Sequence, residues 1–269
     1  MADFDKDGLR NVLLVAVGVC LVCSIVVSTA AVMLKPQQLI NQELDEKQNI
    51  LRAAGMLPAD ADVDAQGRGV DELFAEFAAL AVDLDSGEIL QSIDAASLDP
   101  IRAAKNIELS RALSEDEDVA VLGRRENVSV VYIRRDEAGG LDKVVIPVRG
   151  YGLWGTLFGY LAVEGDLNTV AGLGFYSHKE TPGLGGEVDN PRWRAQWPGV
   201  SLFDAQGMPA VSLVKSRSAP DNAAARHEVD ALAGATLTSR GVANLVEFWT
   251  SDLGFGAFFK QLKSATGAS

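Results

Sequence analysis

Cysteine is nearly absent from this chain of 269 residues, which has only Cys20 and Cys23. Both lie inside one apolar run, so the rest of the chain cannot form an internal disulfide. Cysteines three positions apart share a helix face and could meet a metal ion or the thiols of another subunit. We interpret them instead as small apolar side chains, the usual role of thiols in apolar surroundings. Neither follows the Leu-small-small pattern of a lipoprotein box, so a lipid anchor is not expected.

Positive charge is also scarce. The chain has 24 Lys and Arg residues against 37 Asp and Glu residues, which gives a net charge of −13. A chain of this charge repels phosphate backbones, so we exclude nucleic acid as a partner, and an acidic ligand requires a local basic pocket. The sequence also lacks an internal repeat, the dinucleotide-binding fingerprint and the P-loop pattern.

Hydrophobicity is concentrated in one segment near the start of the chain. Residues 12–34 form a run of 23 residues without a charged side chain. A helix of that length spans about 34 Å, enough to cross the roughly 30 Å hydrocarbon core of a bilayer. We predict one transmembrane helix over residues 12–34, preceded by a cytoplasmic N-terminus of residues 1–11. A cleaved signal peptide is the alternative, and residues 28–31 offer the only suitable cleavage site.

The charges beside this helix do not decide its orientation. Lys6 and Arg10 precede it, whereas Lys35 follows it directly. The segment before the helix is short and the segment after it is long, which favours an uncleaved anchor whose globular part is exported. The reverse orientation stays open.

Residues 35–139 have the composition of a stalk and an intervening α/β region. A stalk helix is predicted over residues 37–54, followed by a turn-rich linker over residues 58–69 and a short amphipathic helix over residues 70–77. Two strands joined by a turn are predicted over residues 79–90, and a solvated acidic loop over residues 114–118. A cation site in the acidic loop is a weaker alternative to solvation.

Strands dominate from Val128 onward. Three runs over residues 128–165 are separated by Gly and Asp, and two further strands and a helix follow at residues 172–177, 211–216 and 242–253. We therefore predict an α+β fold, in which a mostly antiparallel sheet is flanked by helices. A boundary at Gly139-Gly140 defines a C-terminal domain of residues 140–269.

One of two distinctive motifs runs from Tyr176 to Glu187. Three glycines and a proline follow a predicted strand there, and this composition lets the backbone approach a ligand closely. Glycine-rich turns are more often structural, so the motif alone assigns no ligand. His178 beside it is equally compatible with a ligand contact and with a hydrogen-bonded structural histidine.

The second motif, DALAGATLTS at residues 230–239, immediately precedes apolar residues at helical spacing. The simpler interpretation is that Thr238 or Ser239 caps this helix. The alternative is that the helix N-terminus, with its unpaired N–H groups and positive dipole end, stabilises a phosphate attached to Thr236. The residues alone favour the cap.

The second motif resembles the flavinylation motif of proteins whose Thr hydroxyl carries FMN through a phosphoester, and residues 180–186 resemble their flavin-loop signature. Together with residues 151–155 and 185–191, the pattern is similar to the covalent FMN-binding subunit of the sodium-translocating NADH:quinone reductases, and the likeness covers nearly the whole chain. Ala233 departs from this pattern, because the family usually has Ser there, but the acceptor position Thr236 is retained.

The resemblance implies covalent FMN, transferred from FAD to Thr236 by a separate flavin transferase. Thr236 is then an attachment point, and we assign no catalytic residue and no metal ligand. The residues expected to bind the cofactor lie in both motifs, with one basic residue added: Asp230, Gly234, Ala235, Thr236, Leu237 and Thr238; Glu180, Thr181, Gly183, Leu184 and Gly185; and Lys215. Lys215, Arg217, Arg226 and His227 could offset the phosphate charge or stabilise reduced flavin, and each could equally be a surface charge.

The resemblance further implies an electron-relay subunit of a membrane complex that oxidises NADH, reduces ubiquinone and exports sodium ions. NADH and quinone are then bound by partner subunits, and the soluble domain lies on the periplasmic side of a bacterial inner membrane. One alternative is the FMN subunit of the related ferredoxin:NAD electron-transport complex, which usually lacks so long an intervening region. The other is a single-pass anchored binding or scaffold protein without a redox role.

Overall fold

The computed structural model describes residues 8–266, and the chain divides into two compact units, residues 1–46 and 47–269. The described part of the first unit consists mainly of the helix α1 (Leu9–Ala53) up to residue 46, and the exposed apolar part of this helix is long and hydrophobic enough to cross a membrane. The predicted membrane and stalk helices are thus one continuous helix, with Pro36 inside it removing one backbone N–H donor. Most of the predicted cytoplasmic N-terminus, residues 1–7, lies outside the described residues.

The second unit is built around one antiparallel sheet with the strand order β1-β4-β5-β6-β7. Its strands are β1 (Phe77–Asp83), β4 (Val128–Arg135), β5 (Leu141–Tyr151), β6 (Thr156–Glu164) and β7 (Val170–Ser177). Their pairing confirms the predicted antiparallel sheet. Gly139 and Gly140, the predicted domain boundary, lie in the turn between β4 and β5, so the sheet continues across that position.

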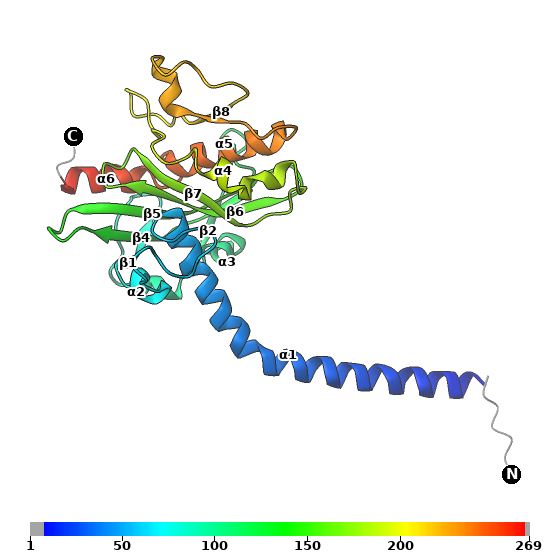
Figure 1. The fold of residues 1–269 in the computed structure, drawn as a ribbon. Helices are drawn as coiled ribbons and strands as arrows, with labels where there is room; N and C mark the ends of the chain where they lie inside the picture. The colour runs from blue at the N-terminus through cyan, green and yellow to red at the C-terminus, as the bar shows by residue number, and fades with distance from the viewer. Residues whose placement is uncertain (1–7, 267–269) are drawn as a thin grey trace, which may run out of the picture. The chain divides into compact units, whose positions relative to one another are not determined.

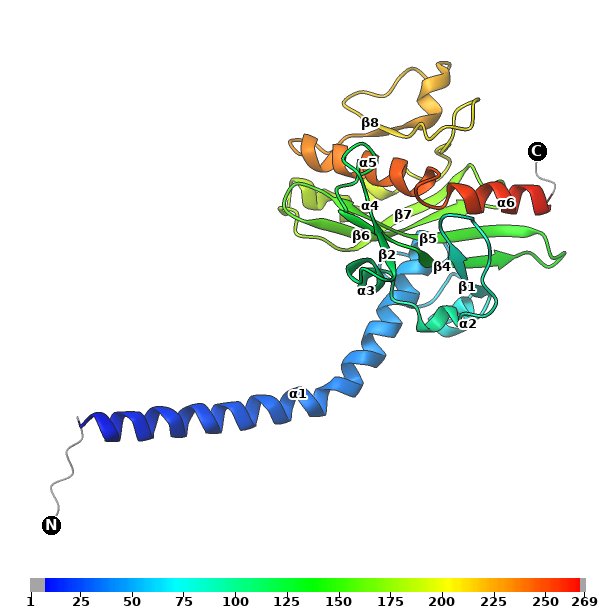
Figure 2. The same ribbon diagram turned by 180° about the vertical axis from the view of Figure 1, so that it is seen from behind.

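Helices cover both faces of this sheet, as Figures 1 and 2 show from opposite sides. Along β5, Val144 and Ile146 point into a core shared with α5 (Thr236–Thr250) and α6 (Gly256–Thr266). Val145 points into a second core, shared with the last turn of α1 and with α2 (Val70–Phe74). This arrangement confirms the predicted α+β fold and gives β5 an apolar side chain on each face.

Short elements complete the second unit: η1 (Ala95–Ser97), α3 (Pro100–Lys105), β2 (Ser110–Ala112), β3 (Arg124–Glu126), η2 (Gly185–Asp189), α4 (Pro191–Arg194), β8 (Ser212–Val214), η3 (Ala223–His227) and β9 (Glu228–Asp230). Unlike the strands of the main sheet, β8 and β9 pair in parallel. The helix predicted over residues 70–77 ends at Phe74, because β1 begins at Phe77. The helix predicted from Val242 begins earlier, at Thr236, and α6 is an additional helix.

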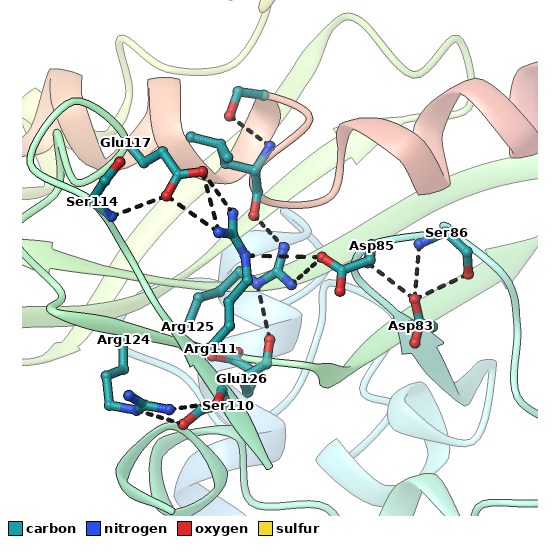
Figure 3. Close-up of polar contacts among 12 residues, drawn as sticks. Asp83, Asp85, Ser86, Ser110, Arg111, Ser114, Glu117, Arg124, Arg125 and Glu126 are labelled. Atoms are coloured by element: carbon teal, nitrogen blue, oxygen red, sulfur yellow. Dashed lines mark hydrogen bonds and ion pairs between the residues drawn. The ribbon is translucent and has the colours of Figure 1, made fainter. Parts of the chain in front are cut away.

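Arg125 connects the intervening region to the segment that follows α5 (Figure 3). Its buried guanidinium donates to Asp85 Oδ1 at 2.6 Å and to a backbone carbonyl beyond α5 at 2.8 Å. Beside it, Arg111 pairs with Glu117 at 3.2 Å, so the acidic loop at residues 114–118 is anchored at one position. Within residues 8–266, no group of three or more His, Cys, Asp and Glu side chains is arranged to hold a metal ion.

Candidate functional site

The start of α5 presents a hydroxyl and free backbone amides together. Gly234 has a φ of +71°, a left-handed conformation that favours glycine, and turns the chain into the helix. Thr236 is the first helical residue and is exposed. The first amide to donate back is Ser239 N, to Ala235 O at 2.9 Å, so the three preceding amides have no acceptor within residues 8–266. Such a helix end can bind an anion.

The expectation that Thr238 or Ser239 caps α5 is wrong. The N-cap residue is Ala235, which provides no side-chain hydrogen bond to the helix. Ser239 Oγ donates to Ala235 O and accepts from the Leu232 amide, whereas Thr238 Oγ1 donates to Glu180 Oε2 at 2.6 Å. These two buried hydroxyls therefore fix the start of α5 to the structure around it.

Glu180 joins α5 to the turn between β5 and β6. Its Oε1 atom accepts hydrogen bonds from the amides of Leu153 at 3.0 Å and Trp154 at 2.9 Å, while Oε2 accepts from Thr238. Burial alone raises the pKa of a carboxyl group, but the hydrogen bonds from Thr238 and from the Trp154 and Leu153 amides outweigh it. They hold the pKa of Glu180 below its ordinary value, so this buried side chain is ionised at neutral pH.

The glycine-rich loop is shaped by its own backbone and reaches the second motif. The amides of Leu184 and Gly186 both donate to Thr181 O, at 3.1 and 2.9 Å, and Gly183 has a φ of +77°. A Cβ atom at Gly234 would lie 3.1 Å from Leu184 Cδ2. The structure therefore brings the two sequence motifs into contact.

His178 supports this loop in the manner of a structural histidine. Its Nδ1 atom accepts a hydrogen bond from the Glu180 amide at 3.1 Å, which places the ring proton on Nε2. Nε2 can then donate to Asp189 Oδ2, which lies 2.7 Å away. Both ring nitrogens are occupied by the protein itself.

Exposed apolar side chains lie on the turn between β5 and β6, on the glycine-rich loop and at the start of α5. They are Leu153, Trp154, Leu184 and Leu237, which are between 39% and 63% exposed. Apolar side chains beside a few fixed polar groups are typical of a small-molecule site. An apolar surface beside an anion-binding helix end suits a ligand that has both a flat apolar ring and a phosphate.

Lys215 lies at the base of the second motif. Val214 pairs with Asp230 in the β8–β9 ladder, and Ala231 N donates to Val214 O at 2.8 Å, so Lys215 follows β8 beside the end of β9. Its side chain is exposed and has no hydrogen-bond or ion-pair partner within residues 8–266. Lys215 is therefore free to meet a negative charge near Asp230.

The other basic groups considered from the sequence belong to a separate feature. A cavity of about 780 Å³ is lined in part by Arg217 and Arg226, and none of its lining residues belongs to either motif. His227 Nδ1 lies 2.8 Å from Ser201 O, a contact that fixes the same region. Arg217, Arg226 and His227 thus lie in a region separate from both motifs, whereas Lys215 lies beside the second one.

Residues 151–155 contribute to the family resemblance, but neither the turn at residues 152–154 nor Gly241 was assigned to the site from the sequence. A Cβ atom at Gly152 would lie 2.6 Å from Glu180 Oε1, and one at Gly241 would lie 2.3 Å from Tyr151 O. The helix thus packs directly on the backbone of the turn. A glycine within a helical pattern is the sequence signal for such close packing, and Gly241 provides it.

Comparison with known proteins agrees with this geometry. The FMN-binding domain family matches residues 152–251, a range that includes both motifs, residues 176–187 and 230–239. A Na(+)-translocating NADH-quinone reductase subunit of Pseudomonas aeruginosa is 50% identical over 260 residues, covering 96% of this chain and 98% of that protein. This chain belongs to the NqrC family of Na(+)-translocating NADH-quinone reductase subunits. The corresponding protein of Yersinia pestis is 44% identical, covering 96% of this chain and 95% of that protein.

Solved structures of NqrC proteins share the fold. The crystal structure of Shewanella oneidensis NqrC aligns with a TM-score of 0.73 and 37% identity, covering 83% of this chain and 99% of that one. The equivalent Na(+)-translocating NADH-quinone reductase subunit of Parabacteroides distasonis aligns with a TM-score of 0.61 and 27% identity, covering 84% and 96%. Membership of the NqrC family confirms the resemblance, and favours neither the ferredoxin:NAD complex nor a scaffold without redox function.

Proposed function

We propose that this chain carries FMN covalently at Thr236 and relays electrons in a membrane complex that oxidises NADH, reduces ubiquinone and exports sodium ions. The supporting observation is the exposed Thr236 at the amide-rich start of α5, inside an FMN-binding domain. Flavin supplies the redox chemistry, because its ring takes up and releases electrons, whereas the protein supplies binding and orientation.

Attachment forms one bond and breaks one. With FAD supplied by a flavin transferase, Thr236 Oγ1 would form the new bond to the phosphorus of the FMN half. The P–O bond within the pyrophosphate would break, AMP would leave with the electron pair, and the hydroxyl proton would pass to solvent. The resulting phosphodiester has one negative charge, and no electrons are gained or lost.

Residues of this chain fit the two parts of FMN. The unpaired amides at the start of α5 and the positive end of its dipole would stabilise the phosphodiester. The exposed side chains of Leu153, Trp154, Leu184 and Leu237 would pack against the apolar ring. Lys215, which follows β8 beside the end of β9, would offset negative charge on the cofactor.

The remaining organisation is proposed by analogy with the family. Residues 12–34 would span a bacterial inner membrane, with residues 1–11 in the cytoplasm and the stalk and intervening region, residues 35–139, in the periplasm. Residues 140–269 would bind FMN there. NADH and ubiquinone would bind to other subunits of the complex, so that this chain only receives and passes on electrons.

The test uses flavin that survives denaturation. Purified full-length chain, produced with the transferase, should give a fluorescent band in a denaturing gel. Thr236→Ala should abolish this fluorescence, because it removes the acceptor oxygen. Thr238→Ala keeps the acceptor, so it should retain most of the fluorescence when incorporation is allowed to run to completion, even if incorporation is slower. A Thr236→Ala band as fluorescent as the wild type would refute attachment at this residue.

A further inference from the structure

The Glu180 side chain is buried, and the protein itself provides hydrogen-bond partners for both of its carboxylate oxygens. The residue is 5% exposed, and its two oxygens accept hydrogen bonds from Thr238, Leu153 and Trp154. A Cβ atom at Gly185 would lie 2.6 Å from both Glu180 Oε2 and Thr238 Oγ1. Because the loop backbone covers this hydrogen bond so closely, Glu180 acts on the site through Thr238 and not by touching a ligand.

The first turn of α5 needs such support. Its N-cap residue, Ala235, has no side chain that can cap the helix, and an uncapped first turn tends to fray. Glu180 is a buried anion beside this turn, at the helix end where negative charge is favoured. The hydrogen bond from Thr238 holds this turn against the loop through a side chain, and it leaves the first amides of the helix without an acceptor within residues 8–266.

The same hydrogen bond sets which way the acceptor points. Successive residues of an α-helix are about 100° apart, so the side chains of Thr236 and Thr238 project in nearly opposite directions. Thr238 is fully buried and Thr236 is exposed. Fixing Thr238 to Glu180 on the inner side consequently fixes the Thr236 hydroxyl on the outer side.

We propose that Glu180 is a positioning residue for flavin attachment, which holds the first turn of α5 through Thr238 and so presents Thr236 Oγ1 to the flavin transferase. The inference rests on the proposed function, because it concerns the formation of the same Thr236 Oγ1–phosphorus bond with release of AMP. Glu180 takes no part in that bond change. Its contribution is to keep the Thr236 side chain projecting outward before the transferase arrives.

The test measures the rate of covalent FMN incorporation into purified full-length apo chain in detergent, with FAD and the transferase. Thr238→Val keeps the shape of the side chain but removes the donor, and should lower kcat about tenfold while the KM for the apo chain stays unchanged. Thr238→Ser restores the hydroxyl and should recover the rate to within about twofold of the wild type. Glu180→Gln, which removes the charge, should also slow incorporation.

Thr250→Val is the matched control. Thr250 is buried at the other end of α5, where its hydroxyl donates to Val246 O at 2.7 Å, so its loss tests the effect of any buried hydroxyl in this helix. This variant should incorporate FMN at the wild-type rate. Circular dichroism checks that each variant is folded, and if Thr238→Val is not, the comparison of Thr238→Ser with Glu180→Gln decides.

Two outcomes separate the inference from the proposed function. Folded Thr238→Val and Glu180→Gln chains that incorporate FMN at the wild-type rate would overturn the positioning role and leave attachment at Thr236 intact. A wild-type chain that takes up no covalent flavin would instead overturn the proposed function on which this role depends.

Discussion

Glu126 and Arg149 form a buried ion pair between β3 and β5. Arg149 Nη1 donates to Glu126 Oε1 at 3.1 Å, a second bond joins Nη2 to Oε2, and Glu126 is fully buried. The Arg149 guanidinium also lies 4.8 Å from the centre of the Trp249 ring. Because Glu126 belongs to the intervening region and Trp249 to α5, this pair links the intervening region to the helix that carries Thr236.

Removal of one partner should be costly. Glu126→Ala leaves the Arg149 charge buried without its carboxylate, and we expect the free energy of unfolding to fall by about 3–5 kcal/mol. Urea denaturation of the full chain in detergent measures the change. Asp252→Ala is the control: the Asp252–Lys260 pair is exposed, with side chains 67% and 68% accessible, and its loss should change stability by less than about 1 kcal/mol. Equal losses for the two variants would contradict the prediction.

Bulk at Gly185 should disturb the flavin site. A Cβ atom there would come within 2.6 Å of the Glu180–Thr238 hydrogen bond, so Gly185→Val must displace the loop or the start of α5. Attachment at Thr236 should remain possible, but the flavin absorption spectrum or midpoint potential should shift. In the control Gly69→Val, the added Cβ meets no atom within 4 Å. A folded Gly185→Val chain with an unchanged spectrum and potential would make the loop purely structural.

The contribution of Glu180 to stability should depend on pH. Its pKa in the folded chain is below the ordinary value of 4.5, so ionised Glu180 stabilises the folded state above that pH. This contribution should disappear as the pH falls through the lowered pKa. Urea midpoints of wild type and Glu180→Gln should therefore differ at neutral pH and converge below about pH 4.5. A difference that stays constant down to pH 3 would contradict this assignment.

The soluble part should be accessible from outside the cytoplasm. Glu115 is exposed in the acidic loop, so a cysteine at this position, in a chain with Cys20 and Cys23 replaced by Ala, should react with an impermeant thiol reagent in spheroplasts. Added protease should also reach the soluble part. Protection from both until the membrane is opened would place the flavin domain in the cytoplasm.

The sequence was sufficient for the parts of the fold that local patterns determine. The charge-free run of α1 and the short apolar runs of β4 to β6, which are separated by Gly and Asp, each satisfy a local rule of length or composition. Helix ends were harder, because α5 starts at Thr236 without a capping side chain, and the usual cap signal pointed instead to Thr238 or Ser239. The stabilising partner, Glu180, lies 58 positions away, beyond the reach of any local rule.

The candidate site was predictable only where a motif marked it. Family resemblance identified Glu180 as a site residue, but it gave no sign that the Glu180 carboxylate is buried and accepts hydrogen bonds from the Leu153 and Trp154 amides and from the Thr238 hydroxyl. The apolar positions Leu153 and Trp154 carry no chemical signal of their own. They become part of the site because the fold places their amides on the Glu180 carboxylate, which is a tertiary relationship.

The continuity of the sheet across Gly139 and Gly140 determines which water-soluble fragments can exist. A fragment that begins at residue 140 would lose β1 and β4, uncover one edge of β5 and expose apolar residues such as Val145, so it should aggregate. The last turn of α1 is also required, because Ile50 and Leu51 are fully buried. A soluble form must therefore be cut within the polar part of α1, between the end of the apolar run and residue 47.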